Sequence, residues 1–325
     1  MEGLLPLGLP GWPQLQQAVL DGALSQDRRG RLALLNHTAA GKRDPRHAAA
    51  VRAARGLILD VEAIARNERE RAVAALPFRA VYDEAYLQAR RPIRDVTIKL
   101  DGALAILYRA DDGIHWAGRS RFDSPVARAA SQLWQARHRS RSVPDELTLI
   151  CELIHPLTSV LIKYDFEALL LIGAIDRTSG RDLPHSELAA LGAELKVPVV
   201  ERIELTLDDV LARVDRFTTE QEGYVIRLED DARVKLSSPF YNAVYDLLRE
   251  CTPWMISEVW SDHDDAEQLL FALPPAARAV VGPVFAQLSA TRRLDGAPRA
   301  DVAAAFRRQR ADLNVPLCTL LADDV

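Results

Sequence analysis

The stretch from residue 96 to residue 236 constrains the fold more than any other part of the chain. It consists of short runs of apolar and β-branched residues separated by turn residues, which is typical of strands. The predicted strands are 96–108 (with a break at 99–102), 113–118, 147–154, 168–176, 198–204, 223–228 and 232–236. The predicted helices are 125–138, 185–195, 207–214 and the segments that follow Pro239. The pattern predicts an α+β fold of mostly antiparallel sheets with flanking helices, followed by a small all-α C-terminal domain.

The first 95 residues are predicted to be mainly helical. Residues 3–23 begin with Pro and Gly and then take a helical spacing that continues to Leu24. The Ala- and Arg-rich segments 47–55 and 62–75 have the same spacing, and a short strand at 56–60 separates them. Because the pattern becomes wholly helical near residue 240, the predicted domains are residues 1–240 and residues 241–325.

The composition is that of an ordinary globular protein. The 325 residues are 48% hydrophobic and 27% charged, enough for one large domain and a smaller one. Cys151, Cys251 and Cys318 match no metal-ligand spacing and are expected to be buried thiols in a reducing compartment. No apolar run reaches the length of a membrane span and no signal sequence is recognisable, so we expect a cytoplasmic location.

Charge is distributed unevenly along the chain. Residues 27–141 hold 23 Lys and Arg against 13 Asp and Glu, whereas the remainder holds 18 and 33. Such a basic half favours a polyanionic partner. Basic residues that only solvate helix faces would produce part of the same signal.

Lysine is scarce. Of 41 Lys and Arg residues, the only lysines are Lys42, Lys99, Lys163, Lys196 and Lys235. Arginine does not lose its proton in proteins, so a lysine among so many arginines indicates a position that needs an amine. The motif Lys-Leu-Asp-Gly at 99–102 lies between two strand-like runs, and Asp-Gly favours a turn. We interpret Lys99 as a nucleophile on a tight turn at the floor of a nucleotide pocket; the alternative is a surface hairpin that carries a lysine.

Three further charged residues lie at or inside predicted strands. Glu152 interrupts the apolar run 147–154, where an ionised carboxylate is costly unless it has a partner. Glu222 precedes the strand 223–228 and Lys235 lies in the next one, so both are predicted on one hairpin. Each position also has an ordinary explanation, namely a carboxylate on the exposed face of a strand and a hairpin with charged ends.

In chain order, Lys-x-Asp-Gly, the glutamate in an apolar strand, Glu-Gly-Tyr-Val and the Val-Lys strand resemble the covalent nucleotidyltransferase superfamily of ATP-dependent ligases and mRNA capping enzymes. The closer resemblance is to RNA ligases of the phage RNA ligase 1 type. The Arg-Gly strand that begins at Arg55, the basic loop 118–122 and the block 151–176 are similar to further motifs of that family. The resemblance covers about residues 33–248.

The resemblance implies an ATP-dependent RNA ligase that forms phosphoric ester bonds between RNA ends. Lys99 would form lysyl-AMP, the AMP would pass to an RNA 5′-phosphate, and an RNA 3′-hydroxyl would displace it. The attacking amine must be neutral, and a nearby positive charge from Lys235, an arginine or a metal favours that form. Mg²⁺ (or Mn²⁺), held with the help of Glu222, would balance the phosphoryl charge.

The resemblance also implies roles for individual residues. The implied nucleotide-binding set is Arg55, Ile98, Lys99, Gly102, Arg119, Glu152 and Lys235, with Glu152 at the ribose, Lys235 at the α-phosphate and the two arginines at the β- and γ-phosphates. The secondary candidates are Asp101, which could only shape the turn, and Lys163, Arg233 and Ser237.

Three positions depart from the family pattern. Thr158-Ser159 stand where the family has Asn-Arg after the third block, a pair connected with RNA end recognition or adenylate transfer. Ser237 stands where the last motif usually has a second lysine, whose role could pass to an arginine such as Arg233. The strand 169–172 is aliphatic where many relatives place an aromatic residue against adenine. Only 90 residues follow Lys235 and they have helical spacing, whereas DNA ligases and capping enzymes usually continue with an OB-fold. This difference favours an RNA ligase with a helical C-terminal domain. RNA repair is a role that the resemblance implies, and no pattern in the sequence indicates whether the natural substrate is tRNA, general single-stranded RNA or damaged RNA ends.

Two other functions remain open at this stage. The chain could be an adenylyltransferase that acts on a non-RNA acceptor, or an inactive relative that only binds nucleotide or RNA. The expected partner is RNA with 5′-phosphate and 3′-hydroxyl ends, the protein is expected to be a monomer, and no membrane partner is expected.

Overall fold

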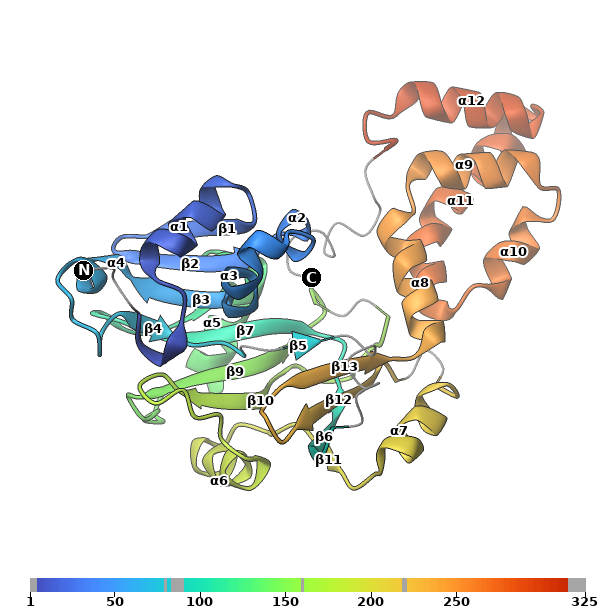
Figure 1. Cartoon of the computed structure of the whole chain (residues 1–325). Helices are drawn as coiled ribbons and strands as arrows, with labels where there is room; N and C mark the ends of the chain where they lie inside the picture. The colour runs from blue at the N-terminus through green and yellow to red at the C-terminus, as the bar shows by residue number, and fades with distance from the viewer. Residues whose placement is uncertain (1–4, 79–80, 83–90, 159–160, 218–220, 315–325) are drawn as a thin grey trace.

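Three largely antiparallel sheets with surrounding helices form the body of the molecule, and a group of helices stands to one side (Figure 1). The computed structural model describes residues 5–78, 81–82, 91–158, 161–217 and 221–314. This architecture confirms the predicted α+β class, its mostly antiparallel sheets and its helical C-terminal region.

The N-terminal sheet has the strand order β1-β2-β3-β4, and every pairing in it is antiparallel. Its strands are β1 (Leu24–Arg29), β2 (Leu32–His37), β3 (Arg55–Asp60) and β4 (Val73–Ala75). The helical elements around it are η1 (Pro6–Gly8), α1 (Trp12–Leu20), α2 (Ala39–Lys42), η2 (Pro45–His47), α3 (Ala48–Ala53) and α4 (Val61–Ala65). This sheet brings the start of β3, and with it Arg55, to the edge of the site described below.

Two predictions for the N-terminal part were wrong. The helical spacing was extended through Leu24, but α1 ends at Leu20 and Leu24 begins a β1–β2 hairpin that was not predicted. Strand β1 has one buried residue among exposed ones and therefore lacks an apolar face that marks a strand. The predicted helix 62–75 stops after Ala65, because Asn67 takes a left-handed conformation and β4 pairs with β3.

The second sheet has the order β10-β9-β7-β8 and contains the main apolar core of the body. Its strands are β7 (Ala103–Ala110), β8 (Gly113–Ala117), β9 (Leu147–Ile154) and β10 (Ala168–Asp176). Helices α5 (Pro125–Arg137) and α6 (His185–Leu195) pack against it. Ser124 caps α5 by accepting a hydrogen bond from the backbone N–H of Ala127, and Pro125 occupies its first position, so the sequence specifies where this helix begins.

The third sheet has five strands in the order β11-β6-β12-β13-β5. They are β5 (Val81–Tyr82), β6 (Ile93–Lys99), β11 (Arg202–Ile203), β12 (Gly223–Leu228) and β13 (Arg233–Ser237); α7 (Leu207–Val214) lies beside β12. The predicted hairpin between residues 222 and 235 is present as β12–β13. The predicted strand 198–204 was too long, since only 202–203 form a strand and Val199 makes a single bridge to Leu171.

Strands β6 and β7 are consecutive in the chain but belong to different sheets. Lys99 ends β6 in the five-stranded sheet, and Ala103 begins β7 in the second sheet. The segment between them therefore crosses from one sheet to the other. The alternative of a simple surface hairpin at Lys-Leu-Asp-Gly is wrong.

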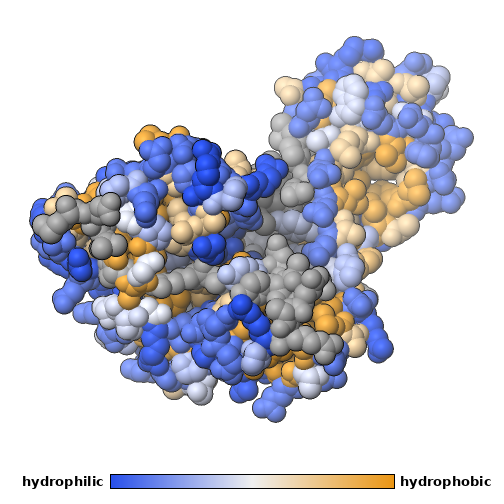
Figure 2. Space-filling model, in the orientation of Figure 1, coloured by the Kyte–Doolittle hydropathy of each residue, from blue (hydrophilic) through white to orange (hydrophobic). Residues whose placement is uncertain are grey.

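The helical region consists of α8 (Pro239–Glu250), α9 (Pro253–Asp262), α10 (Ala266–Ala272), α11 (Pro275–Asp295) and α12 (Arg299–Gln309). It has a core of its own that includes Trp260, Leu288 and Phe306. Figure 2 shows apolar residues on its surface, and Leu269 and Phe271 are among the exposed ones. No helix in the described part of the chain is both long and apolar enough to span a membrane.

Candidate active site

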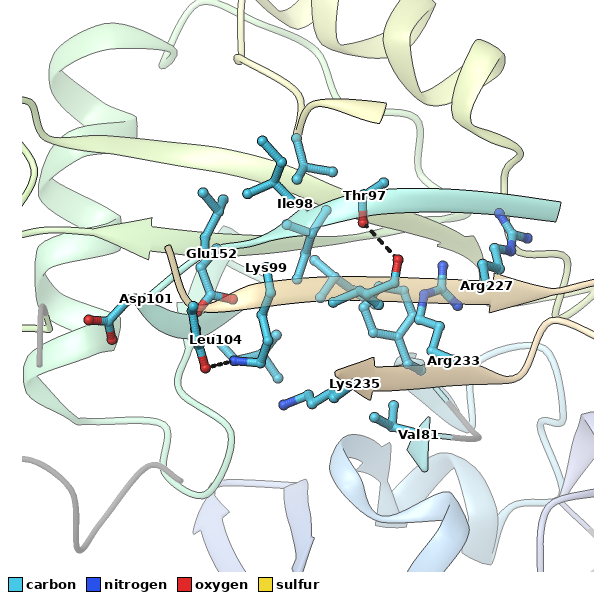
Figure 3. Close-up of a pocket in the computed structure, with 18 of the residues that line it drawn as sticks. Val81, Thr97, Ile98, Lys99, Asp101, Leu104, Glu152, Arg227, Arg233 and Lys235 are labelled. Atoms are coloured by element: carbon cyan, nitrogen blue, oxygen red, sulfur yellow. Dashed lines mark hydrogen bonds and ion pairs between the residues drawn. The ribbon is translucent and has the colours of Figure 1, made fainter. Parts of the chain in front are cut away.

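A cavity of about 320 Å³ lies where the five-stranded sheet meets the second sheet (Figure 3). Its lining comes from all three sheets and from α8. It includes the predicted residues Arg55, Ile98, Lys99, Asp101, Gly102, Arg119, Glu152, Glu222, Arg233 and Lys235. The structure therefore gathers residues from positions 55 to 235 of the sequence around one pocket, whose volume is in the usual range for small-ligand sites.

One face of the five-stranded sheet forms the pocket floor. Side chains alternate along each strand, and the register aligns every second residue of β6, β12 and β13 into rows. The rows are Lys99–Gly223–Ser237, Thr97–Val225–Lys235 and Asp95–Arg227–Arg233. The first two rows carry the ammonium groups and the third carries two guanidinium groups. We call the first two rows the nucleophile end of the pocket and the third row the arginine end.

Lys99 is held by Glu222 at the nucleophile end. The Lys99 ammonium group forms an ion pair with the Glu222 carboxylate, and both side chains are largely buried. Lys99 pairs with Gly223 across the sheet, so Glu222, the residue immediately before β12, lies beside the lysine. Burial raises the pKa of Glu222, and the positive charge of Lys99 opposes that rise.

Glu152 lies in β9 and lines the pocket beside Lys99 (Figure 3). Burial raises its pKa to about 7, although Lys99 and Lys235 both favour the ionised form. The strand packs closely against the segment that follows Lys99, because a Cβ on Gly102 would overlap the Leu153 carbonyl oxygen and the Glu152 side chain. Glycine at 102 therefore brings Glu152 and Lys99 to the same cavity.

Lys235 projects from β13 into the pocket (Figure 3). Lys235 as a whole is exposed, but the protein around its ammonium group partly desolvates it and lowers its pKa, and the like charges of Lys99 and Arg55 lower the pKa further. Among the described residues, neither Lys235 nor Glu152 has a hydrogen-bond or ion-pair partner in the protein. Both groups are therefore available to a ligand.

Arg55 and Arg119 come together through a glycine. Gly56 has φ +91° and lies directly against the backbone of Arg119, and a Cβ there would overlap the Ile106 side chain. Both arginines line the pocket on the side that faces the N-terminal sheet. In the Arg-Gly pair at 55–56, the arginine thus supplies a charge, and the glycine allows close packing against Arg119 and Ile106.

The Asp101 carboxylate is buried and fully engaged. One oxygen accepts hydrogen bonds from the backbone N–H groups of Leu161 and Ile162, both at 2.7 Å, and the other accepts the Tyr241 hydroxyl at 2.9 Å. The Asp101 backbone N–H donates to the Tyr164 hydroxyl at 3.0 Å. Asp101 is therefore an anchor for the segment that carries the nucleophile.

Arg233 is engaged at the arginine end. Its guanidinium forms an ion pair with Asp182 and lies over the Phe78 ring, 3.7 Å from the ring centroid. Phe78 in turn packs on Gly173, which follows the aliphatic stretch 169–172. An aromatic residue thus reaches this wall from a distant part of the chain, and Arg233 is committed to structural partners.

Two secondary candidates do not line the pocket. Lys163 is exposed and lies outside it. Ser237 is half-buried and lies in the row of Lys99, separated from it by the side-chain-free Gly223. The backbone N–H of Ile98, which does line the pocket, donates to the Glu201 carbonyl at 3.1 Å.

Several lining residues were not predicted. Phe78, Asp182 and Arg227 belong to the arginine end or support it, and Tyr241 and Tyr245 enter from α8. The two tyrosine rings are four residues apart on that helix, with centroids 6.1 Å apart. Such spacing directly after the Val-Lys strand was a usable signal, because residues i and i+4 share one face of a helix.

The acidic groups fit a divalent cation only in combination with a ligand. Within the described ranges, no group of three or more His, Cys, Asp or Glu side chains is arranged to hold a metal by itself. Glu222 and Glu152 offer the oxygen donors that Mg²⁺ and Mn²⁺ prefer, and such ions complete their shell with phosphate and water. The residues present therefore fit a metal that arrives with a nucleotide.

The part of the chain that carries most of this site matches a known protein family. Residues 95–240 match the sequence model of the RNA ligase family. A Naegleria gruberi RNA ligase solved with pyrophosphate is 22% identical, with a TM-score of 0.39 over 50% of this chain and 53% of that one. A putative ATP-dependent DNA ligase from Aquifex aeolicus is 15% identical, with a TM-score of 0.48 over 91% and 78%.

The chain spans about half the length of the Naegleria gruberi ligase structures that it matches. A comparison with curated proteins gave no match. The family match covers the strands β6 to β13 that carry Lys99, Glu152, Glu222 and Lys235.

The family match over residues 95–240 supports a covalent nucleotidyltransferase-type ligase, the class that the motifs in the sequence resemble, and the lining of the pocket fits that class. Within that class, the family whose model matches residues 95–240 is that of the RNA ligases.

Proposed function

We propose that the protein is an ATP-dependent RNA ligase that joins a 5′-phosphate to a 3′-hydroxyl through lysyl-AMP and RNA-adenylate. The observation that supports this most is the Lys99 amine, paired with buried Glu222 on the floor of a cavity that also contains Glu152 and Lys235. A Naegleria gruberi RNA ligase has been solved with ATP and manganese, which supports the choice of nucleotide and of a divalent cation.

The first step is attack of the Lys99 nitrogen on the α-phosphorus. A P–N bond forms, the bond to pyrophosphate breaks, and the amine loses a proton. Lys99 must leave its ion pair with Glu222 before it attacks, because an ammonium group has no lone pair.

The remaining charged groups suit the triphosphate. Lys235 lies one row from Lys99 and is assigned to the α-phosphate, while Arg55 and Arg119 are assigned to the β- and γ-phosphates. Glu222 would hold Mg²⁺ or Mn²⁺, which neutralises charge on the phosphoryl oxygens. Glu152, with its raised pKa, is assigned to the ribose hydroxyls.

The arginine end is assigned to the nucleobase. Phe78 and Ile172 line it with apolar surface, and Val225 lies in the neighbouring row. The base would pack on these side chains, with ring stacking available from Phe78. The pocket floor is three rows long. Lys99 lies in the first row and the arginine end is the third, so this apolar surface lies at the opposite end from Lys99.

Labelling tests the first step. The full chain incubated with α-labelled ATP and Mg²⁺ or Mn²⁺ should retain covalently bound AMP through denaturing gel electrophoresis, and Lys99→Ala should retain none. Lys196→Asn is the matched control, since Lys196 is exposed in a left-handed position at the end of α6 that asparagine tolerates. Label that persists in Lys99→Ala contradicts the assignment of the nucleophile.

Strand joining tests the later steps. Single-stranded RNA with a 5′-phosphate should become circular or joined, with AMP released. Label without transfer to RNA would indicate an adenylyltransferase with another acceptor. Nucleotide binding without label would indicate an inactive relative.

A further inference from the structure

The segment that carries the nucleophile is fastened to the helical region. The Asp101 carboxylate accepts hydrogen bonds from the backbone N–H groups of Leu161 and Ile162 and from the Tyr241 hydroxyl. The Asp101 backbone N–H donates to the Tyr164 hydroxyl. Leu161, Ile162 and Tyr241 belong to the apolar cluster of α8–α12, and Tyr164 packs against that cluster. Asp101, two residues after Lys99, is thus tied to the core of the helices.

The start of α8 connects to Glu222 as well. Ser238 donates its backbone N–H to the Glu222 carbonyl at 2.8 Å, and its hydroxyl accepts the backbone N–H of Tyr241 at 2.9 Å. Ser238 is fully buried, so this capping arrangement is shielded from water. One helical turn therefore fixes the backbone of Glu222 and the hydroxyl that meets Asp101.

We infer that Tyr241 is a positioning residue for adenylyl transfer, acting through Asp101 to hold Lys99 at the pocket floor. This rests on the proposed function. The helical region then serves the first chemical step directly, through a hydroxyl delivered to a carboxylate two residues from the nucleophile.

The chemistry of the contact suits this role. Burial and the negative charges of Glu222 and Asp101 raise the pKa of the Tyr241 hydroxyl, so it remains a donor throughout the physiological range. A hydrogen bond to a buried carboxylate is stronger than one between neutral groups, and a lost donor leaves the carboxylate oxygen unsatisfied. Asp101 would then shift toward other donors and move the segment that follows Lys99.

Tyr241→Phe tests the inference, because it removes only the hydroxyl. In single-turnover labelling with saturating ATP, we expect the rate constant for lysyl-AMP formation to fall about tenfold. The ATP concentration at half-maximal rate and the final labelled fraction should stay unchanged. A tyrosine needed only for folding would lower the final fraction and leave the rate constant of the folded chains as in the wild type, and that result would overturn the inference.

Tyr108→Phe is the matched control. Tyr108 is also buried and its hydroxyl accepts a hydrogen bond from Arg29 at 2.8 Å, but it lies outside the pocket. Its rate constant should equal that of the wild type. An equal loss in both variants would show a general effect of removing a buried hydroxyl and would contradict a specific role for Tyr241.

A double-mutant cycle with Asp101→Asn gives a second test. If Tyr241 acts through Asp101, Tyr241→Phe should change the rate constant less than twofold in the Asp101→Asn background. A full tenfold loss there contradicts the inference. A wild-type protein that takes no label refutes the proposed function itself, whereas a labelled wild type with an unaffected Tyr241→Phe refutes only the role of Tyr241.

Discussion

Both ends of the pocket contain charged side chains, but the two ends differ in how many of these side chains have a partner in the protein. At the arginine end, Arg233 pairs with Asp182, and Arg227 donates to the Leu183 carbonyl at 2.7 Å and to the Asp231 carboxylate at 2.6 Å. At the nucleophile end, Glu152 and Lys235 have no such partner among the described residues. Paired buried charges maintain a shape, whereas unpaired ones with displaced pKa values are typical of sites that act on a ligand.

The largest expected effect separates charge from nucleophilicity at Lys99. In Lys99→Arg the guanidinium can keep the ion pair with Glu222, but it cannot lose its proton. We expect AMP labelling to fall at least about 10⁴-fold with little change in thermal stability. The labelling rate and a melting curve measure both. Residual labelling within tenfold of the wild type would contradict the nucleophile assignment.

The next effect concerns stability at the arginine end. Asp182→Ala leaves two buried guanidinium groups with one carboxylate fewer, and we expect it to lower the free energy of unfolding by about 3–5 kcal/mol. Urea denaturation measures this. The comparison variant is Glu152→Gln, which should keep the stability of the wild type or exceed it while labelling is lost. Similar stability losses in both variants would break the contrast between the two ends.

The pH dependence of stability sharpens the same contrast. The pKa of Glu152 is raised to about 7 in the folded protein, so between about pH 4.5 and pH 7 the folded state holds a proton that the unfolded chain has released. The contribution of this group to the free energy of unfolding therefore falls as pH rises through that range, by up to about 3 kcal/mol. Glu152→Gln should gain stability over the wild type between pH 5 and pH 7.5. A constant difference in urea midpoints would contradict this.

The smallest expected effect is tighter ATP binding when a lysine replaces Ser237. This residue lies in the row of Lys99 and faces the same side of the sheet, with Gly223 between them. Ser237→Lys should restore a second cation near the phosphates and tighten ATP binding about threefold to tenfold. Equilibrium titration measures the affinity, with Lys163→Ala as an exposed lysine outside the pocket for comparison. Weaker binding would show that this end already has its full positive charge.

The sequence predicted the strands that carry the charged residues and the order of those residues, because apolar alternation and turn residues are local signals. It did not predict that β6 and β7 lie in different sheets, since local patterns do not report which strands pair. Of the N-terminal sheet, the sequence predicted only the strand 56–60, which is β3. Strand β1 was missed because it is mostly polar and exposed, so its strand character comes from pairing with β2.

The unpredicted site residues share a cause. Phe78 reaches Gly173, Asp182 reaches Arg233, and Tyr241 reaches Asp101, each across a large separation in sequence. Nothing near any one of them in the chain indicates its partner. Glu152 shows the reverse case, because a carboxylate in an apolar run was visible as an anomaly and lies in the pocket.

The pairing of β6 with β12 has a consequence for protein synthesis. It joins Lys99 to Gly223, so the ribosome must add 124 residues after the lysine before these two strands can pair and the ion pair with Glu222 can form. At a translation rate of roughly 5–20 residues per second, this interval lasts roughly 6–25 s. During that time the nascent chain has the lysine but neither the carboxylate that holds it nor the α8 tyrosine. If the proposed function holds, AMP labelling is therefore expected only of chains whose synthesis has passed the end of β13, and the label would report completed folding of the site.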